Sequence, residues 1–282
     1  MRSKPPAGAP PSLVEAARRG DKKALEKLLS LEQARIYAYG LKMCRNPEDA
    51  RDIAQETMLA MSRSLHDFRG DAALSTWMFQ IARSFCIKKR RRRKGAPAQT
   101  EDVDGMALAD PSPGPEQTLG AKEMEAALGE ALETLPVGAR EVLVLRDVEG
   151  LTAPEVAKVL GTSVLAVKSK LHRARIALEK TLGPRLGHER PRAKARKSCP
   201  DVVALYSQQL EGELTASVCH RMAQHVAECP DCARACDSLK ESLALCQRLP
   251  AVPVELRDSV RSLVRELIDR RPTDGRIAPK RG

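Results

Sequence analysis

Four potential metal ligands in the C-terminal third of the chain constrain its fold most strongly. Cys199 is followed by twenty-five residues, His225, three residues, Cys229, two residues and Cys232. His225 and Cys229 are four positions apart, so they share one face of a helix, and the Cys-Pro-Asp-Cys turn can bend around one ion. Three thiolates and one imidazole form a tetrahedral Cys₃His set that suits Zn²⁺. We therefore predict that a small helical domain, with a helix over residues 200–209, brings these four residues together.

Four more cysteines and histidines in the same part of the chain leave two interpretations open. They are Cys219, His220, Cys236 and Cys246. As additional ligands they would favour a soft metal, because thiolate-rich clusters select such ions. As apolar residues, Cys236 and Cys246 would only fill a helical core. The chain has no Cys-x-Cys pair, which favours Zn²⁺ or Cd²⁺ over copper as the sensed metal.

The composition favours small helical domains. Only seven of the 282 residues are aromatic, so cores must be built from Leu, Val, Ala, Ile and Met, and we predict an all-α fold. The net charge of +11 and the pI near 9.4 indicate a polyanionic partner such as nucleic acid. A basic ribosomal or membrane-surface protein would share this charge.

Apolar runs are short, Val142 to Leu145 being typical, whereas a membrane span needs about 20 residues. The first residues have no apolar segment for export. We therefore expect a cytoplasmic protein with no membrane contact, in which thiols stay reduced. Six of the eight cysteines lie beyond residue 198, which favours metal or redox ligands over disulfides.

Shifts in composition divide the chain into seven predicted segments. We expect disorder over 1–11, a helical bundle over 12–94, a flexible linker over 95–118, a second helical domain over 119–182, a basic linker over 183–198, the cysteine-rich domain over 199–249, and an amphipathic helix and tail over 250–282.

Local signals place helices in the first bundle. Asp21 can cap one helix, and Asn46-Pro47 followed by acids begins another. The second of these carries Ile53, Thr57, Met61 and Leu65 at intervals of four, which predicts a buried face. A third helix begins near Ser75 and ends in seven basic residues, 88–94.

The second domain has the pattern of a helix-turn-helix. Thr152 and Glu155 form a capping box, Gly161 makes a turn and Ser163 caps the next helix. We predict that Val164, Val167 and Leu171 face inward. The outward residues are then Lys168, Ser169, Lys170, His172, Arg173 and Arg175. A helical hairpin with merely solvated basic residues is the alternative.

This domain resembles region 4 of bacterial extracytoplasmic-function sigma factors. The resemblance rests on Leu135-Pro136, Arg140-Glu141-Val142, Gly150-Leu151-Thr152, Glu155-Val156-Ala157 and the run from Val167 to Arg175. It implies binding to the polymerase β flap and reading of the −35 promoter element by Ser163 and the six outward residues. Lys170 stands where the family more often has Arg, which weakens a bidentate base contact.

The first bundle resembles region 2 of the same family. The matching residues are Glu48-Asp49-Ala50, Asp52, Ile53, Gln55-Glu56, Phe68-Arg69-Gly70-Asp71, Ser75-Thr76-Trp77 and Ile81-Ala82-Arg83. The resemblance implies binding to the β′ clamp helices of core RNA polymerase by Asp49, Asp52, Gln55 and Glu56. It also implies capture of the unpaired −10 element by Phe68, Arg69, Trp77, Arg83, Lys88, Lys89 and Arg90.

Simpler explanations exist for each feature of this bundle. The acids can be a solvated face, Trp77 can be core, and the polybasic run can bind any phosphate backbone. After Arg83 the family usually has Asn, with Asp a few positions on, whereas this chain has Ser84-Phe85-Cys86. That difference leaves the −10 preference open.

The cysteine-rich segment resembles the zinc-binding anti-sigma domain, through Cys199-Pro200-Asp201, Leu210 to Leu214, and His225 to Cys232. Fused to sigma regions, it is similar to the metal-responsive group of sigma factors. We therefore predict a sigma factor, not an enzyme, whose activity depends on metal binding. Alternatives are a structural zinc with control by thiol redox or a partner, and a DNA-binding repressor independent of polymerase.

Overall fold

The computed structural model describes residues 9–68, 70, 72–95, 115–188, 199–247, 258 and 262. This part of the chain is helical apart from turns and short connections and contains no strand, which confirms the predicted all-α fold. Within it, no helix is long and apolar enough to cross a membrane.

The first part, here called the N-terminal bundle, is built from α1 to α4. Their bounds are α1 Pro11–Arg18, α2 Lys22–Cys44, α3 Pro47–Ser64, with a 3₁₀ turn Leu65–Asp67, and α4 Leu74–Gly95. The predicted caps are present: the side chains of Asp21 and Asn46 accept backbone hydrogen bonds at the starts of α2 and α3. The predicted face of α3 is buried, because Ile53, Thr57 and Met61 are fully inaccessible.

The second part, here called the helix-turn-helix domain, runs from α5 to α8. Its elements are α5 Pro115–Thr134, α6 Val137–Leu143, a π-helix η2 Val144–Val148, α7 Ala153–Leu160, α8 Val164–Leu182 and a 3₁₀ turn η3 Gly183–Leu186. The capping box of Thr152 and Glu155 begins α7, and Ser163 caps α8. Gly161 ends α7 with φ of 64°, a left-handed conformation that glycine adopts at little cost.

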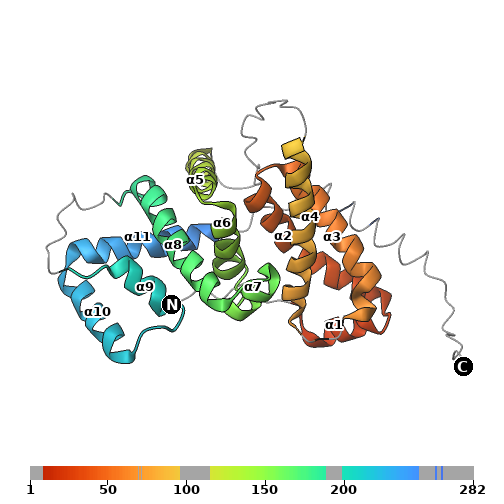
Figure 1. Ribbon diagram of the computed structural model, residues 1–282. Helices are drawn as coiled ribbons and strands as arrows, with labels where there is room; N and C mark the ends of the chain where they lie inside the picture. The colour runs from red at the N-terminus through yellow and green to blue at the C-terminus, as the bar shows by residue number, and fades with distance from the viewer. Residues whose placement is uncertain are drawn as a thin grey trace, which may run out of the picture.

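The third part, here called the C-terminal module, consists of α9 Val202–Leu210, α10 Ala216–Glu228 and α11 Pro230–Cys246. α9 matches the helix predicted over residues 200–209, with Asp201 as its cap. The helix-turn-helix domain lies between the N-terminal bundle and this module, and α11 packs across α8 (Figure 1).

Some segment boundaries differ from those predicted. α5 begins at Pro115, inside the predicted linker, and residues 183–186 of the predicted basic linker form a 3₁₀ turn. Residues 1–8 and almost all of the predicted C-terminal helix over 250–282 lie outside the described residues; positions 258 and 262 are helical.

One apolar core joins the three parts. It runs from Leu28 and Ile53 in the N-terminal bundle through Val142 and Leu171 to Leu239 in α11. A second, small cluster contains Val202, Cys232 and Cys236 within the C-terminal module. The module therefore has little apolar core of its own, and much of its buried surface is shared with the helix-turn-helix domain.

Candidate metal-binding and DNA-reading sites

The four predicted metal ligands lie together. One donor atom from each of Cys199, His225, Cys229 and Cys232 falls within 4.8 Å of the others. The Sγ atoms of Cys199 and Cys229 are 3.9 Å apart, and Nε2 of His225 is 3.2 Å from Sγ of Cys232. A tetrahedral ion with Zn–S bonds of about 2.3 Å needs sulfur atoms about 3.8 Å apart. The donor set therefore fits Zn²⁺.

Three helices position these ligands. Cys199 precedes α9, His225 lies in the last turn of α10, and Cys229 is the N-cap of α11, with Cys232 in the first turn. A backbone hydrogen bond from Cys232 lowers the pKa of the Cys229 thiol, which favours the thiolate form that binds metals. Burial raises the pKa of Cys232 to about 12. An ion at this site would join the three helices of the module.

The four additional candidates do not belong to this cluster. Cys219 and His220 are on α10 and partly or fully exposed. Cys236 is buried in the small apolar cluster near Val202, and Cys246 is fully buried at the end of α11 in the main core. The positions of Cys236 and Cys246 favour the apolar interpretation for both residues.

The outer face of the recognition helix α8 differs in part from the prediction. Val167 and Leu171 are fully buried, as predicted, but Val164 is 36% exposed. Because of this exposure, the prediction that Val164 faces inward was wrong. Val164 is the first residue of α8. Leu165, which the sequence analysis missed, is 78% exposed. The i, i+4, i+8 spacing of Leu165, Ser169 and Arg173 could have identified it.

Leu165, Ser169 and Arg173 form an outward stripe along the first half of α8, and all three are exposed. Nε of Arg173 donates a hydrogen bond to the Ser169 carbonyl oxygen at 3.3 Å. In a helix-turn-helix, the N-terminal residues of the second helix contact base edges in the major groove. This stripe offers an apolar group, a hydroxyl and a guanidinium to such edges.

Arg175 was predicted to face DNA, and the structure contradicts this. Its side chain is fully buried, with Nη2 2.5 Å from Asp147 Oδ1 and 2.8 Å from Glu211 Oε1. It also donates to the Ser207 carbonyl oxygen at 3.0 Å. Burial lowers its pKa, but Asp147 and Glu211 outweigh that effect and raise it above the usual value. Arg175 is buried because α9 and its following turn cover this part of α8.

Glu211 belongs to an acidic turn (residues 211–213) between α9 and α10. Besides the Arg175 contact, Glu211 Oε2 lies 3.0 Å from Nε of Arg146. Glu213 Oε1 lies 3.0 Å from Nζ of Lys168, another predicted DNA contact. The acidic turn thus occupies two of the basic side chains that were predicted to bind promoter DNA.

The remaining predicted −35 residues have varied surroundings. Ser163 is exposed and serves as the N-cap of α8. Lys170 is partly buried and directs Nζ towards Gly138. His172 is partly buried, and its Nδ1 atom has no hydrogen-bond partner among the described residues.

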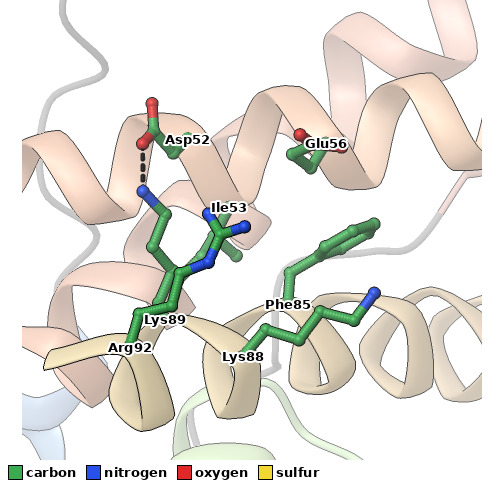
Figure 2. Close-up of a pocket in the computed structure, with 7 residues that line it drawn as sticks. All are labelled: Asp52, Ile53, Glu56, Phe85, Lys88, Lys89 and Arg92. Carbon is green, nitrogen blue, oxygen red and sulfur yellow. Dashed lines mark hydrogen bonds and ion pairs between the residues drawn. The ribbon is translucent and has the colours of Figure 1, made fainter. Parts of the chain in front are cut away.

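In the N-terminal bundle, the predicted polymerase-binding acids of α3 face basic residues of α4 (Figure 2). Nζ of Lys89 forms an ion pair with Asp52 and lies 3.7 Å from Oδ1 of Asp49. Nζ of Lys88 lies 5.1 Å from the centre of the Phe85 ring. A shallow pocket between the helices is lined by Asp52, Ile53, Glu56, Phe85, Lys88, Lys89 and Arg92.

The other predicted polymerase and −10 residues divide between solvent and internal contacts. Glu56 is exposed and Gln55 partly so. The rings of Phe68 and Trp77 pack together with centres 5.3 Å apart. Arg69 lies outside the described residues, and Arg90 is partly buried.

Arg83 is partly buried and contacts the helix-turn-helix domain, because its Nε lies 3.1 Å from Glu141 Oε1. Tyr39 donates a hydrogen bond to the same carboxylate oxygen at 2.9 Å. Nearby, Arg35 Nε lies 3.0 Å from Glu149 Oε2. Burial raises the pKa of Glu149 to about 6 despite the opposing effect of Arg35. Buried charges therefore hold the N-terminal bundle against the helix-turn-helix domain.

Three family models match the chain. Sigma-70 region 2 matches residues 28–96, Sigma-70 region 4 matches 125–178, and a putative zinc-finger model matches 199–233. They coincide with most of the N-terminal bundle, most of the helix-turn-helix domain, and the segment that holds all four ligands.

Curated relatives are similar to about three fifths of the chain. The RNA polymerase sigma-H factor of Pseudomonas aeruginosa is 34% identical over 182 residues, covering 62% of this chain and 94% of the relative. The ECF RNA polymerase sigma factor SigM of Mycobacterium tuberculosis is 33% identical over 172 residues, covering 61% and 83%. Among solved structures, CnrH in complex with the cytosolic domain of CnrY matches at 25% identity and a TM-score of 0.44, covering 63% and 97%.

Proposed function

Because this chain belongs to the extracytoplasmic-function group of the sigma-70 family, we propose that its C-terminal module controls promoter recognition through the metal ion it holds. The sigma function itself, in transcription initiation, follows from the family. Members of this family bind core RNA polymerase and promoter DNA and are not enzymes.

At the −35 element, we assign base reading to the outward stripe of Leu165, Ser169 and Arg173. Lys168 and Lys170 would contact phosphates, since Lys acts as a compact point charge. The polymerase β flap would bind another face of this domain.

At the −10 element, we assign stacking on bases to Phe68 and Trp77, and neutralisation of the backbone to the basic end of α4. Asp52 and Glu56 are exposed acids on α3 and would contact the β′ clamp helices, together with the more buried Asp49 and Gln55. This assignment gives a function to the acidic side chains of α3 and to the basic side chains of α4 that lie beside them.

The acidic turn carries the proposal of control. It pairs with Lys168 through Glu213 and with the buried Arg175 through Glu211, and DNA phosphates would need the Lys168 cation. A negatively charged segment that covers α8 therefore competes with DNA for the domain. In this state the C-terminal module inhibits the −35 contact.

The sign of the metal effect follows from linkage. The four ligands are assembled in the same conformation in which the acidic turn covers α8. A ligand that binds one conformation better shifts the population towards it. Metal binding should therefore favour the covered form and lower transcription, and metal loss should raise it. Because the ligands must lose protons to bind the ion, the metal effect should weaken at low pH.

The test compares promoter binding by the holoenzyme formed with the wild-type chain and with the double variant Glu211→Gln, Glu213→Gln. With Zn²⁺ present, the variant should bind a −35-containing duplex more tightly, because the competing charges are gone. Asp237→Asn is the matched control, since it removes an exposed acid of the module that pairs only locally with Lys240. Equal affinity for all three proteins would refute the competition.

A further inference from the structure

Two cysteines outside the metal cluster face one another in the N-terminal bundle. Cys44 is the last residue of α2, and Cys86 lies in the middle of α4. Their Sγ atoms are 3.2 Å apart, although the residues are 42 positions apart in the chain. Cys86 is buried and Cys44 is partly exposed. Cys86 also belongs to the segment, Ser84 to Cys86, where the chain departs from the family pattern.

The surroundings of the pair favour reaction at Cys44. The hydrogen bond with Cys44 and burial raise the pKa of Cys86 far above its usual value, so Cys86 keeps its proton. Arg90 acts electrostatically on Cys86, and Arg140 on Cys44. Cations beside a thiol favour its thiolate. Cys44 is therefore the sulfur that a reagent from solvent can reach first.

A metal site does not explain the pair. Glu141 also acts electrostatically on Cys86, but its carboxylate is engaged by Tyr39 and Arg83. Among the described residues, the groups that could hold a metal do not include Cys44 or Cys86. Two sulfur atoms alone make an incomplete site for an ion such as Zn²⁺, which takes four ligands.

We propose that Cys44 and Cys86 are a redox-active pair that forms a reversible disulfide by exchange with a small-molecule disulfide such as oxidised glutathione. The Cys44 thiolate attacks one glutathione sulfur and releases one glutathione thiolate. Cys86 then loses its proton and attacks the Cys44 sulfur, which releases the second glutathione. The two cysteines lose two electrons, and oxidised glutathione is reduced to two thiols.

The geometry makes this bond accessible without unfolding. A disulfide has a sulfur–sulfur length of about 2.05 Å, so the two Sγ atoms must approach by roughly 1 Å from their present 3.2 Å. The bond would join α2 to α4, the helices whose Tyr39 and Arg83 contact Glu141. This inference goes beyond the sigma function and does not depend on metal control.

The experiment is peptide mapping of the full-length, Zn²⁺-loaded protein after equilibration in glutathione buffers of increasing oxidised fraction. Samples are acid-quenched, alkylated with iodoacetamide and digested with trypsin, which cuts after Lys42, Arg45, Arg83 and Lys88. We expect a linked pair of peptides, 43–45 with 84–88, that accumulates with oxidised glutathione to become the major form and disappears with dithiothreitol.

Two variants identify the route. Cys44→Ser should give no linked peptide, while Cys86→Ser should retain glutathione on Cys44, because the resolving thiol is gone. Cys219, which is partly exposed and outside the metal cluster, is the internal control: it should carry glutathione and form no bond with either residue. The proposal is wrong if iodoacetamide still alkylates both Cys44 and Cys86 after equilibration in fully oxidised buffer, or if the linked peptide forms only in urea.

Discussion

The helix-turn-helix domain uses opposite charges on its two sides. Towards the N-terminal bundle it presents two acids. Glu141 contacts Arg83 and Tyr39 of that bundle, and Glu149 contacts Arg35. Towards the C-terminal module it presents Arg146, Lys168 and Arg175, which meet the acidic turn. Both contacts involve buried charged groups, but only the second uses a cation, Lys168, that DNA phosphates could also bind.

This difference separates a contact that DNA can replace from one that it cannot. In the proposed function, a phosphate backbone would compete with Glu213 for Lys168, so promoter binding and module docking would exclude each other. DNA offers nothing to Glu141 or Glu149. The contact with the N-terminal bundle must therefore open for other reasons, such as polymerase binding.

The largest effect should come from Arg175→Met. The substitution leaves Asp147 and Glu211 close together with their shared cation removed, and breaking a buried pair in this way costs about 3–5 kcal/mol. The free energy of unfolding, measured with urea, should fall by that amount. Arg173→Ala, in the exposed stripe, should change it by less than about 0.5 kcal/mol. Equal losses for both variants would mean that Arg175 is not buried beneath the module.

Cys229→Ser should weaken Zn²⁺ binding by about 100-fold. Structural zinc sites release about 10–16 kcal/mol through four ligands, so one ligand contributes roughly 3 kcal/mol. Competition with a chromogenic chelator measures the affinity, and Cys219→Ser is the control because it lies outside the cluster. Unchanged affinity in Cys229→Ser would mean that the metal binds elsewhere and that it does not control the docking of the C-terminal module.

The contact with the N-terminal bundle should respond to pH through Glu149. Its pKa is raised in the folded protein to about 6, from 4.5, so the folded state binds the proton more tightly than the unfolded state. Stability should thus fall by about 2 kcal/mol as pH rises from 4.5 to 6. Urea unfolding of wild type and Glu149→Gln across this range measures the difference, and parallel pH profiles would contradict it.

The smallest effect concerns Leu165, on the face that the module leaves exposed. An exposed leucine at the start of a recognition helix can contact a thymine methyl group. Replacing thymines of the −35 element one at a time by deoxyuridine should weaken holoenzyme binding about fourfold at one position, since a buried methyl contributes about 0.8 kcal/mol. Leu165→Ala should lose this dependence. If Leu165→Ala retains it, another side chain reads that methyl group.

Sequence patterns identified the features that depend on near neighbours. The caps at Asp21, Asn46, Thr152 and Ser163 follow from short-range hydrogen bonding, and the four metal ligands from spacing on adjacent helices. Periodicity located the buried face of α3 because that face packs within one bundle. These predictions hold because their partners lie close in the chain or in one small domain.

Periodicity could not identify what covers a polar helix face. Arg175 has the charge and spacing of a DNA contact, yet an acid 36 positions later in the chain buries it. Leu165 is apolar, but the buried apolar residues of α8 are Val167 and Leu171, and residue type alone did not show that Leu165 faces solvent. Cys44 and Cys86 meet only because α2 and α4 pack side by side, so their separation in sequence gave no sign of the contact.

The central claim is that the metal-assembled module covers α8 and lowers transcription. Run-off transcription from the chain's own upstream promoter, with core RNA polymerase and either Zn²⁺ or a chelator, tests it directly. Zn²⁺ should lower the transcript from the wild type, the chelator should raise it, and the double variant Glu211→Gln, Glu213→Gln should be active in both. Equal transcript in all lanes, or a rise with Zn²⁺ in the wild type, would contradict the account.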